Sequence, residues 1–219
     1  MPNIMPDLPP ILAVVTLQRL DDLSPLAGAL HAGGVRAIEL ALRTPVALTA
    51  ITRLRELLPD TLIGAGTVLN PAQLDQARDA GAHFTLAPGF NPQTLQHALA
   101  TGHPHIPGVA TPSDIQAACG LGASLLKLFP AKPLGGLPTL ATMNAPFEHL
   151  NLRYVPMGGI GMADIGAWLS SPVIASIGMS AIAPTALIKA GDWPQIQANA
   201  AATTAAAANC AATTRNHLR

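Results

Sequence analysis

Residues 105–129 read HIPGVATPSDIQAACGLGASLLKLF, and this stretch decides the fold class because it holds a complete strand–helix–strand unit. Its apolar ends, His105–Ala110 and Leu125–Phe129, have the length and composition of buried strands. Between them, Thr111-Pro112-Ser113-Asp114 is a helix-start signal, and Gly122 stands where the helix should end. Two strands connected through a helix are expected to lie parallel in one sheet.

The same alternation of apolar runs and Ala/Leu-rich helical stretches extends from Ile11 to the C-terminus. The six other predicted strands are Ile11–Leu17, Ala37–Leu42, Leu62–Val68, Phe84–Pro88, Arg153–Met157 and Val173–Met179. Eight parallel strands close most simply into a barrel, so we predict a single (β/α)₈ TIM barrel domain over residues 1–219. The alternative is an open doubly wound sheet, but Thr16-Leu17-Gln18-Arg19 stands where such a sheet usually carries GxGxxG. The Ala-rich segment at about 195–214 is predicted to form an extended last helix.

Composition excludes several classes of protein. Hydrophobic residues make up 49% and charged residues 11%, which is the reverse of a disordered chain. Twelve basic residues balance twelve acidic ones without clustering, so no nucleic-acid partner is expected. No apolar run reaches about 18 residues, and the first ten residues do not resemble a signal peptide. Cys119 and Cys210 form no disulfide framework and the seven histidines are scattered, which predicts a cytoplasmic protein without a metal site or membrane contact.

Two ionisable residues stand inside predicted strands, where a barrel should be apolar. Lys127 lies in Leu125–Phe129, and Glu39 lies in Ala37–Leu42. Because strand side chains alternate, Lys127 should share a face with Leu125 and Phe129, while Leu126 and Leu128 face the outer helices. Glu39 and Arg43 are expected on the same inner face. A buried charge needs a partner or a function, so the pair is either a structural ion pair or a reactive site.

The chemistry of this pair points to aldol cleavage. Desolvation disfavours the ammonium form of a buried lysine, and the neutral amine can attack a ketone to form a Schiff base. A neighbouring carboxyl group can then carry protons through the carbinolamine, imine and enamine steps. Lys127 and Glu39 are therefore the candidate catalytic residues, and Arg43 adds a guanidinium suited to a carboxylate or phosphate.

Glycines after the last two strands predict an anion site. Gly158 and Gly159 follow the seventh strand, while Gly178 and Ser180 end the eighth. In (β/α)₈ barrels the loops after these strands frequently bind phosphate, because backbone N–H groups can approach it closely. The alternative is a pair of ordinary tight turns.

At these residues the sequence resembles the 2-keto-3-deoxy-6-phosphogluconate (KDPG) aldolase and 4-hydroxy-2-oxoglutarate aldolase family, over about Ile11 to Trp193. Seven stretches carry the resemblance in the family's order: Ala32-Gly33-Gly34-Val35, Ile38-Glu39-Leu40-Ala41-Leu42-Arg43-Thr44, Gly64-Ala65-Gly66-Thr67-Val68-Leu69-Asn70, Ala87-Pro88-Gly89, Ile106-Pro107-Gly108, Lys127-Leu128-Phe129-Pro130-Ala131 and Pro156-Met157-Gly158-Gly159-Ile160.

The resemblance implies a class I aldolase (a lyase) that cleaves KDPG to pyruvate and glyceraldehyde 3-phosphate, as a homotrimer without metal or organic cofactor. It implies that Lys127 forms the Schiff base and Glu39 shuttles protons. Arg43 and Thr67 would hold the pyruvate carboxylate, and Pro88 and Phe129 would line the pocket. The phosphate end of the substrate would lie at Gly158, Gly159 and Ser180.

Met157 departs from the family pattern, because gluconate-type members usually carry Thr between Pro156 and the glycine pair. Methionine cannot address a substrate hydroxyl in the way that threonine can. The C4 epimer 2-keto-3-deoxy-6-phosphogalactonate and 4-hydroxy-2-oxoglutarate therefore stay open as substrates. Two alternatives of other classes also stay open: a sugar-phosphate isomerase or epimerase, which would not need Lys127, and a non-catalytic phosphometabolite-binding barrel.

Overall fold

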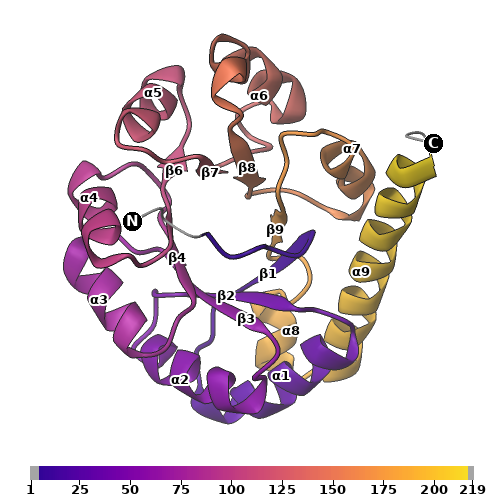
Figure 1. Ribbon diagram of the computed structural model, residues 1–219. Coiled ribbons are helices and arrows are strands. Elements are labelled where there is room, and N and C mark those ends of the chain that lie inside the picture. Colours follow the sequence, from indigo (N-terminus) through magenta and orange to yellow (C-terminus); the bar gives the residue numbers. More distant parts are fainter. Residues whose placement is uncertain (1–4, 217–219) are drawn as a thin grey trace.

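The computed structural model describes residues 5–216 and has a strongly curled, entirely parallel sheet surrounded by helices (Figure 1). The strands are β1 (Ile11–Val15), β2 (Ala37–Ala41), β3 (Leu62–Gly66), β4 (Phe84–Leu86), β5 (His105–Ile106), β6 (Gly108–Val109), β7 (Leu125–Leu128), β8 (Arg153–Pro156) and β9 (Ile177–Met179). The α-helices are α1 (Leu23–Ala32), α2 (Ala47–Leu57), α3 (Pro71–Asp79), α4 (Pro92–Thr101), α5 (Pro112–Gly120), α6 (Gly136–Asn144), α7 (Ile165–Leu169), α8 (Thr185–Ala190) and α9 (Trp193–Asn216). Three short 3₁₀ helices, Leu20–Asp22, Ala145–Leu150 and Met162–Asp164, complete the elements.

Regular strand pairing covers two arcs. One sheet has the order β5-β4-β3-β2-β1-β9 and the other has the order β6-β7-β8. Pro107 separates β5 from β6, because proline has no N–H to donate to a ladder. Between β8 and β9 there are isolated bridges, Tyr154 with Ile174 and Met157 with Gly178. The α/β fold predicted from the sequence is confirmed, whereas closure into one eight-stranded ring stays a prediction.

The predicted strands lie at the right places but several are too long. Leu62–Val68 ends at Gly66 because Thr67 has a φ of 60°, which leaves the extended region. Val173–Met179 was wrong as a continuous strand, since only Ile177–Met179 is one. Residues 173–175 exchange backbone hydrogen bonds with Tyr154 of β8, and Ile177 then turns to Pro10 before β1. The segment thus pairs first with β8 and then with the chain leading into β1.

Polar side chains cap the starts of three helices, one of them at the predicted position Thr111. The side chains of Asn70 and Asn91 accept hydrogen bonds from the backbone N–H of Gln73 and Thr94. Thr111 and Asp114 form a complete capping box at α5. These caps satisfy backbone donors that have no partner within the helix, and they fix where each strand-to-helix loop ends.

Side chains pack in two layers on either side of the sheet. The outer core lies between strands and helices and contains Leu126 and Leu128, as alternation along β7 predicts. A smaller inner cluster fills the centre of the curled sheet: Leu8, Leu12, Ala37, Phe84, Leu86, Ile106, Leu125, Val155 and Met157. This plug borders the cavity at the carboxyl-terminal ends of the strands, where its member Met157 forms part of the lining.

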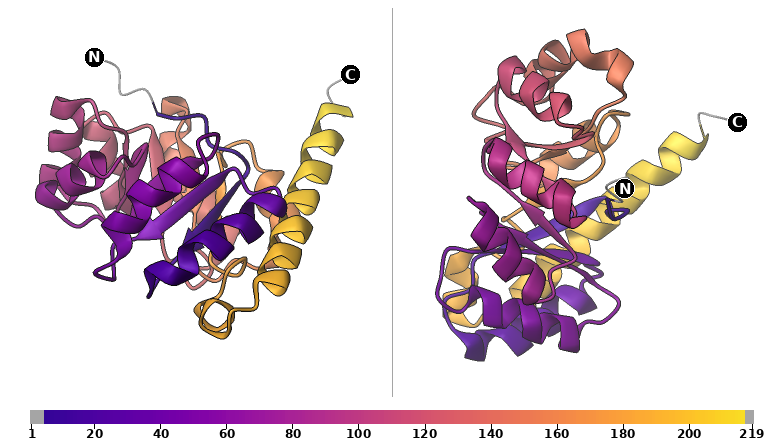
Figure 2. Two further views of the ribbon diagram at one scale, coloured as in Figure 1. Left: turned by 90° about the horizontal axis from the view of Figure 1, so that it is seen from below. Right: turned by 60° about the vertical axis from the view of Figure 1, so that its left-hand side comes forward.

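The predicted Ala-rich helix is confirmed as α9, which packs along α1 and α7 (Figures 1 and 2). Gly33 is needed at this contact, because a Cβ there would collide with Ala200. Thr204 also donates a hydrogen bond of 2.8 Å to the carbonyl of Gly33. Among the residues described, α9 included, no helix has both the length and the hydropathy required to cross a membrane.

Candidate active site

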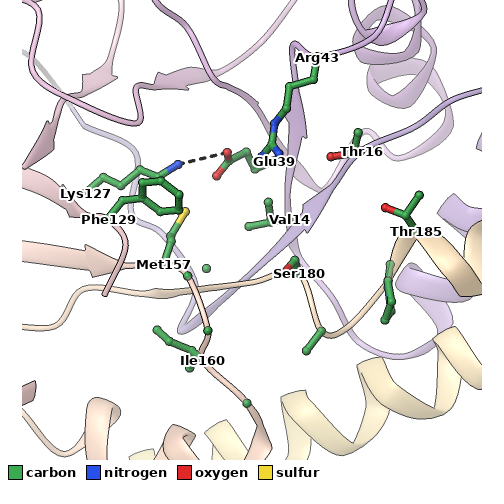
Figure 3. A pocket seen from close by; sticks show the side chains of 17 residues that line it. Val14, Thr16, Glu39, Arg43, Lys127, Phe129, Met157, Ile160, Ser180 and Thr185 are labelled. Atoms are coloured by element: carbon green, nitrogen blue, oxygen red, sulfur yellow. Dashed lines mark hydrogen bonds and ion pairs between the residues drawn. The ribbon is translucent and has the colours of Figure 1, made fainter. Parts of the chain in front are cut away.

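A cavity of about 700 Å³ opens at the carboxyl-terminal ends of the strands (Figure 3). Every second residue of β1 points to the centre of the sheet, so Leu12 lies in the inner plug while Val14 and Thr16 reach the cavity. The full lining is Val14, Thr16, Glu39, Arg43, Lys127, Phe129, Met157, Gly158, Gly159, Ile160, Gly161, Gly178, Ser180, Ala181, Ala183, Pro184 and Thr185.

Lys127 and Glu39, 88 residues apart in sequence, meet in the wall of this cavity (Figure 3). The Lys127 Nζ lies 3.5 Å from the Glu39 Oε1, and the two side chains are only 7% and 1% exposed. The Glu39 Oε2 is buried and has no hydrogen-bond partner. A structural ion pair would be expected to satisfy both carboxylate oxygens, so this acceptor stands ready for a group that the cavity admits.

Two neighbours shape the environment of the pair. The Lys127 Nζ lies 5.5 Å from the centre of the Phe129 ring, and this ring forms an apolar wall that is 37% exposed. Gly66 of β3 gives Glu39 its place, because a Cβ at Gly66 would occupy the position of the Glu39 carboxylate. A glycine one strand away is therefore what allows a charged side chain to fit into the sheet interior.

Arg43 supplies positive charge at the exposed side of the cavity. Its Nε donates a hydrogen bond of 3.2 Å to the hydroxyl of Thr67, which follows β3. Thr67 itself does not line the cavity, and it reaches Arg43 through the left-handed turn at its own backbone. The guanidinium nitrogens beyond Nε make no hydrogen bond or ion pair with the described residues, which leaves them available to an anion.

The glycine segments line the cavity on the side of β8 and β9. Gly158 and Gly159 have φ values of 99° and 79°, a region that other residues rarely adopt. Gly178 is packed against Met157, and a Cβ at this glycine would collide with the methionine side chain. The predicted anion site therefore consists of glycine backbone that lines the cavity, with the Ser180 hydroxyl beside it (Figure 3).

The cavity brings together all of the predicted site residues except Thr67 and Pro88. Pro88 is half-buried after β4, where its backbone packs closely against Gly108. Sequence reasoning missed Thr16 and Thr185, the two other hydroxyl groups of the wall. The alternation along β1 could have identified Thr16, but Thr185 belongs to a connection whose path is set by packing. Among the described residues, no three His, Cys, Asp or Glu side chains converge as a metal site would require.

Comparison with known proteins gives a consistent result. The model of the KDPG and KHG aldolase family matches residues 3–199. The 2-dehydro-3-deoxy-phosphogluconate aldolase of Treponema pallidum is 42% identical over 188 residues, which cover 86% of this chain and 89% of the relative. The KHG/KDPG aldolase of Escherichia coli is 37% identical over 187 residues, or 85% of this chain and 87% of the relative.

Solved structures agree with these sequence matches. KDPG aldolase from Legionella pneumophila, with pyruvate captured at low pH as a covalent carbinolamine intermediate, superposes with a TM-score of 0.86 at 36% identity. That match covers 93% of this chain and 98% of the other. The KDPG aldolase of Zymomonas mobilis with 3-phosphoglycerate gives a TM-score of 0.83 at 38% identity, over 90% and 91% of the two chains. The chain therefore belongs to the KDPG and KHG aldolase family, as its motifs predicted.

Proposed function

We propose that the protein is a class I aldolase that cleaves KDPG to pyruvate and glyceraldehyde 3-phosphate through a Schiff base on Lys127. One observation carries the proposal: an almost fully buried lysine faces a glutamate with one unpartnered oxygen, and both line an open cavity. The Legionella pneumophila relative, in which pyruvate forms a covalent carbinolamine, supports the same chemistry.

The reaction follows from the two facing groups. The neutral Lys127 amine adds to the C2 carbonyl of the substrate, and loss of water from the carbinolamine gives an iminium ion. Glu39 then takes the proton of the C4 hydroxyl, the C3–C4 bond breaks, and its electron pair enters the iminium to form an enamine. Glyceraldehyde 3-phosphate leaves as the aldehyde. Protonation of the enamine at C3 by Glu39 and hydrolysis of the imine release pyruvate and restore the amine.

Binding roles are assigned by charge and position. Arg43, held by Thr67, is proposed to bind the pyruvate carboxylate, with the Phe129 ring bounding that end, whereas Pro88 lies outside the cavity. Gly158, Gly159, Gly178 and Ser180 are proposed to bind the phosphate, because they line the cavity and backbone N–H groups and a hydroxyl suit an anion. No metal or organic cofactor is needed in this scheme.

Trapping with borohydride tests the proposal. The protein is incubated with pyruvate and sodium borohydride, and its intact mass and peptide map are measured. We expect one reduced pyruvyl adduct on Lys127, and turnover and adduct should both be lost in Lys127→Met. The chain has only two other lysines, Lys132 and Lys189, and both are exposed, so they serve as internal controls. An unlabelled but folded protein would rule out the aldolase and favour the isomerase or epimerase alternative.

Met157 makes the C4 stereochemistry a separate question, because its buried thioether meets Gly178 where the family pattern has a hydroxyl. Comparing kcat/KM for KDPG, its galactonate epimer and 4-hydroxy-2-oxoglutarate gives the preference directly. In Met157→Thr we expect the ratio of kcat/KM for KDPG to kcat/KM for its epimer to rise about tenfold, which corresponds to the free energy of one hydrogen bond. An unchanged ratio would remove residue 157 from substrate discrimination.

We also infer a closed (β/α)₈ barrel, a single domain, a homotrimer and a cytoplasmic location. The bridges between β8 and β9 and the succession of β5 and β6 support closure.

Exposed apolar side chains such as Leu69, which is 50% exposed, are compatible with subunit contacts. Light scattering after size exclusion measures the assembly, and a monomeric mass would reject the trimer.

A further inference from the structure

The glycine loop, residues 157–161, is held from behind by two side chains that do not line the cavity. All five residues of the loop line the cavity, whereas Lys132 and Asp164 do not. The Lys132 Nζ donates hydrogen bonds of 2.8 and 3.1 Å to the two carboxylate oxygens of Asp164. The Asp164 Oδ2 also accepts a hydrogen bond of 2.8 Å from the backbone N–H of Gly161. Asp164 thus connects the end of the loop to Lys132.

The backbone of the segment after β7 holds the beginning of the same loop. The N–H of Ala131 donates a hydrogen bond of 2.7 Å to the carbonyl of Met157, and the N–H of Lys132 donates one of 3.0 Å to that of Gly158. These two bonds hold the carbonyl groups of Met157 and Gly158, and they leave the N–H groups of the glycines for the substrate phosphate. Lys132 is therefore attached to the loop at both ends, by its backbone at Gly158 and through Asp164 at Gly161.

The lysine packs against the loop without lining the cavity. A Cβ placed on Gly159 would come within 3.0 Å of the Lys132 Cβ, so the Lys132 stem packs directly over this glycine. The Lys132 and Asp164 side chains are 55% and 26% exposed. Partly exposed ion pairs contribute little to global stability, so the two residues are poorly explained as a fold-stabilising contact.

We propose that the Lys132–Asp164 ion pair positions the glycine loop for the phosphate group of the substrate, without touching the phosphate itself. The proposal rests on the phosphate assignment made above. Gly158 and Gly159 have the conformational freedom to leave the geometry that an anion requires, and an anion site loses affinity when its N–H groups are not held in place. The ion pair would limit that freedom from outside the cavity, where it does not compete with the substrate.

The proposal is tested by removing the ion pair while keeping the hydrogen bond from the Gly161 N–H to residue 164. Asp164→Asn retains a carbonyl oxygen for the Gly161 N–H but loses the charge that pairs with Lys132. Lys132→Met removes the same interaction from the other side. For each variant we expect KM for the phosphorylated substrate to rise three- to tenfold with kcat nearly unchanged. Inhibition by inorganic phosphate should weaken by the same factor, and the double variant should be no worse than either single one.

Four controls separate positioning from other roles. Lys132→Arg should keep KM near that of the parent, because an arginine can still pair with Asp164. Turnover of unphosphorylated 4-hydroxy-2-oxoglutarate and the melting temperature should be unaffected in all variants. Pyruvate trapping on Lys127 should also persist. If trapping fails already in the parent protein, the proposed function is wrong, and that result is distinct from a failure of the ion pair.

A lower KM for the phosphorylated substrate in Asp164→Asn would overturn the proposal. If Lys132 were a direct phosphate ligand, Asp164→Asn would free its ammonium group and lower KM for the phosphorylated substrate. An equal loss with phosphorylated and unphosphorylated substrates would show a general structural role. An unchanged KM in both single variants would show that the loop needs no such support.

Discussion

The sheet buries polar side chains on both of its faces, and the two groups behave differently. On the inner face, Lys127 and Glu39 form a charged pair at the floor of the cavity. On the outer face, Thr85 of β4 bonds through its hydroxyl to the Nδ1 of His105 on β5, at 2.9 Å. Phe84 and Leu86 point inward, so alternation turns Thr85 toward the helix layer, where α3 and α4 pack (Figure 1).

The two groups differ in whether a polar atom remains without a hydrogen-bond partner. Burial lowers the pKa of His105 to about 4, with a smaller contribution from the nearby His103, so the ring stays neutral and serves as a hydrogen-bonding part of the core. The His105 ring is hydrogen-bonded to Thr85, whereas the Glu39 Oε2 has no partner and its neighbours line an open space. A buried ionisable residue is therefore a weak sign of function by itself. An unsatisfied acceptor beside an opposite charge in a cavity is a much stronger one.

The largest effect is expected on the inner face. Glu39→Gln keeps the size of the side chain but removes its capacity to take and return a proton. We expect kcat to fall by roughly 10²–10⁴-fold, the usual contribution of general acid–base catalysis, while pyruvate still labels Lys127 more slowly under borohydride. Glu56→Gln, on the exposed side of α2, is the matched control and should leave kcat unchanged. Undiminished kcat in Glu39→Gln would reduce the pair to a structural ion pair.

Much of the fold could be predicted because its signals are local. The cap formed by Thr111 and Asp114 and the alternation along β7 depend on residues within a few positions of one another. Closure of the ring depends on pairing between segments that no local pattern specifies. The irregular segment at 173–175 and the turn at Thr67 show this, since each is set by a neighbouring strand or side chain.

Site residues could be predicted where their type is unusual for their position, and they were missed where it is ordinary. Lys127 and Glu39 are conspicuous because a charge seldom stands in a buried strand. Thr16 and Thr185 look like any threonine, and only the three-dimensional path of the chain brings them to the cavity. Lys132 and Asp164 resemble ordinary surface charges 32 residues apart, so their pairing behind the glycine loop could not be read from the sequence.

A smaller effect, on stability alone, is expected on the outer face. In the unfolded chain His105 should titrate near pH 6.5, whereas in the folded protein burial lowers its pKa to about 4. The folded state therefore binds fewer protons between these values, so the stability that the neutral ring allows is complete above pH 6.5 and is lost as the pH falls towards 4. Linkage gives a loss of about 2 kcal/mol at pH 5 relative to pH 7.5. His105→Gln should remove this part of the pH dependence, which urea unfolding of both proteins at the two pH values measures. The difference between the two proteins therefore measures the titration of His105 together with its coupling to His103. Equal pH dependence in parent and variant would mean that the imidazolium is tolerated there, and with it the contrast between the two faces would fail.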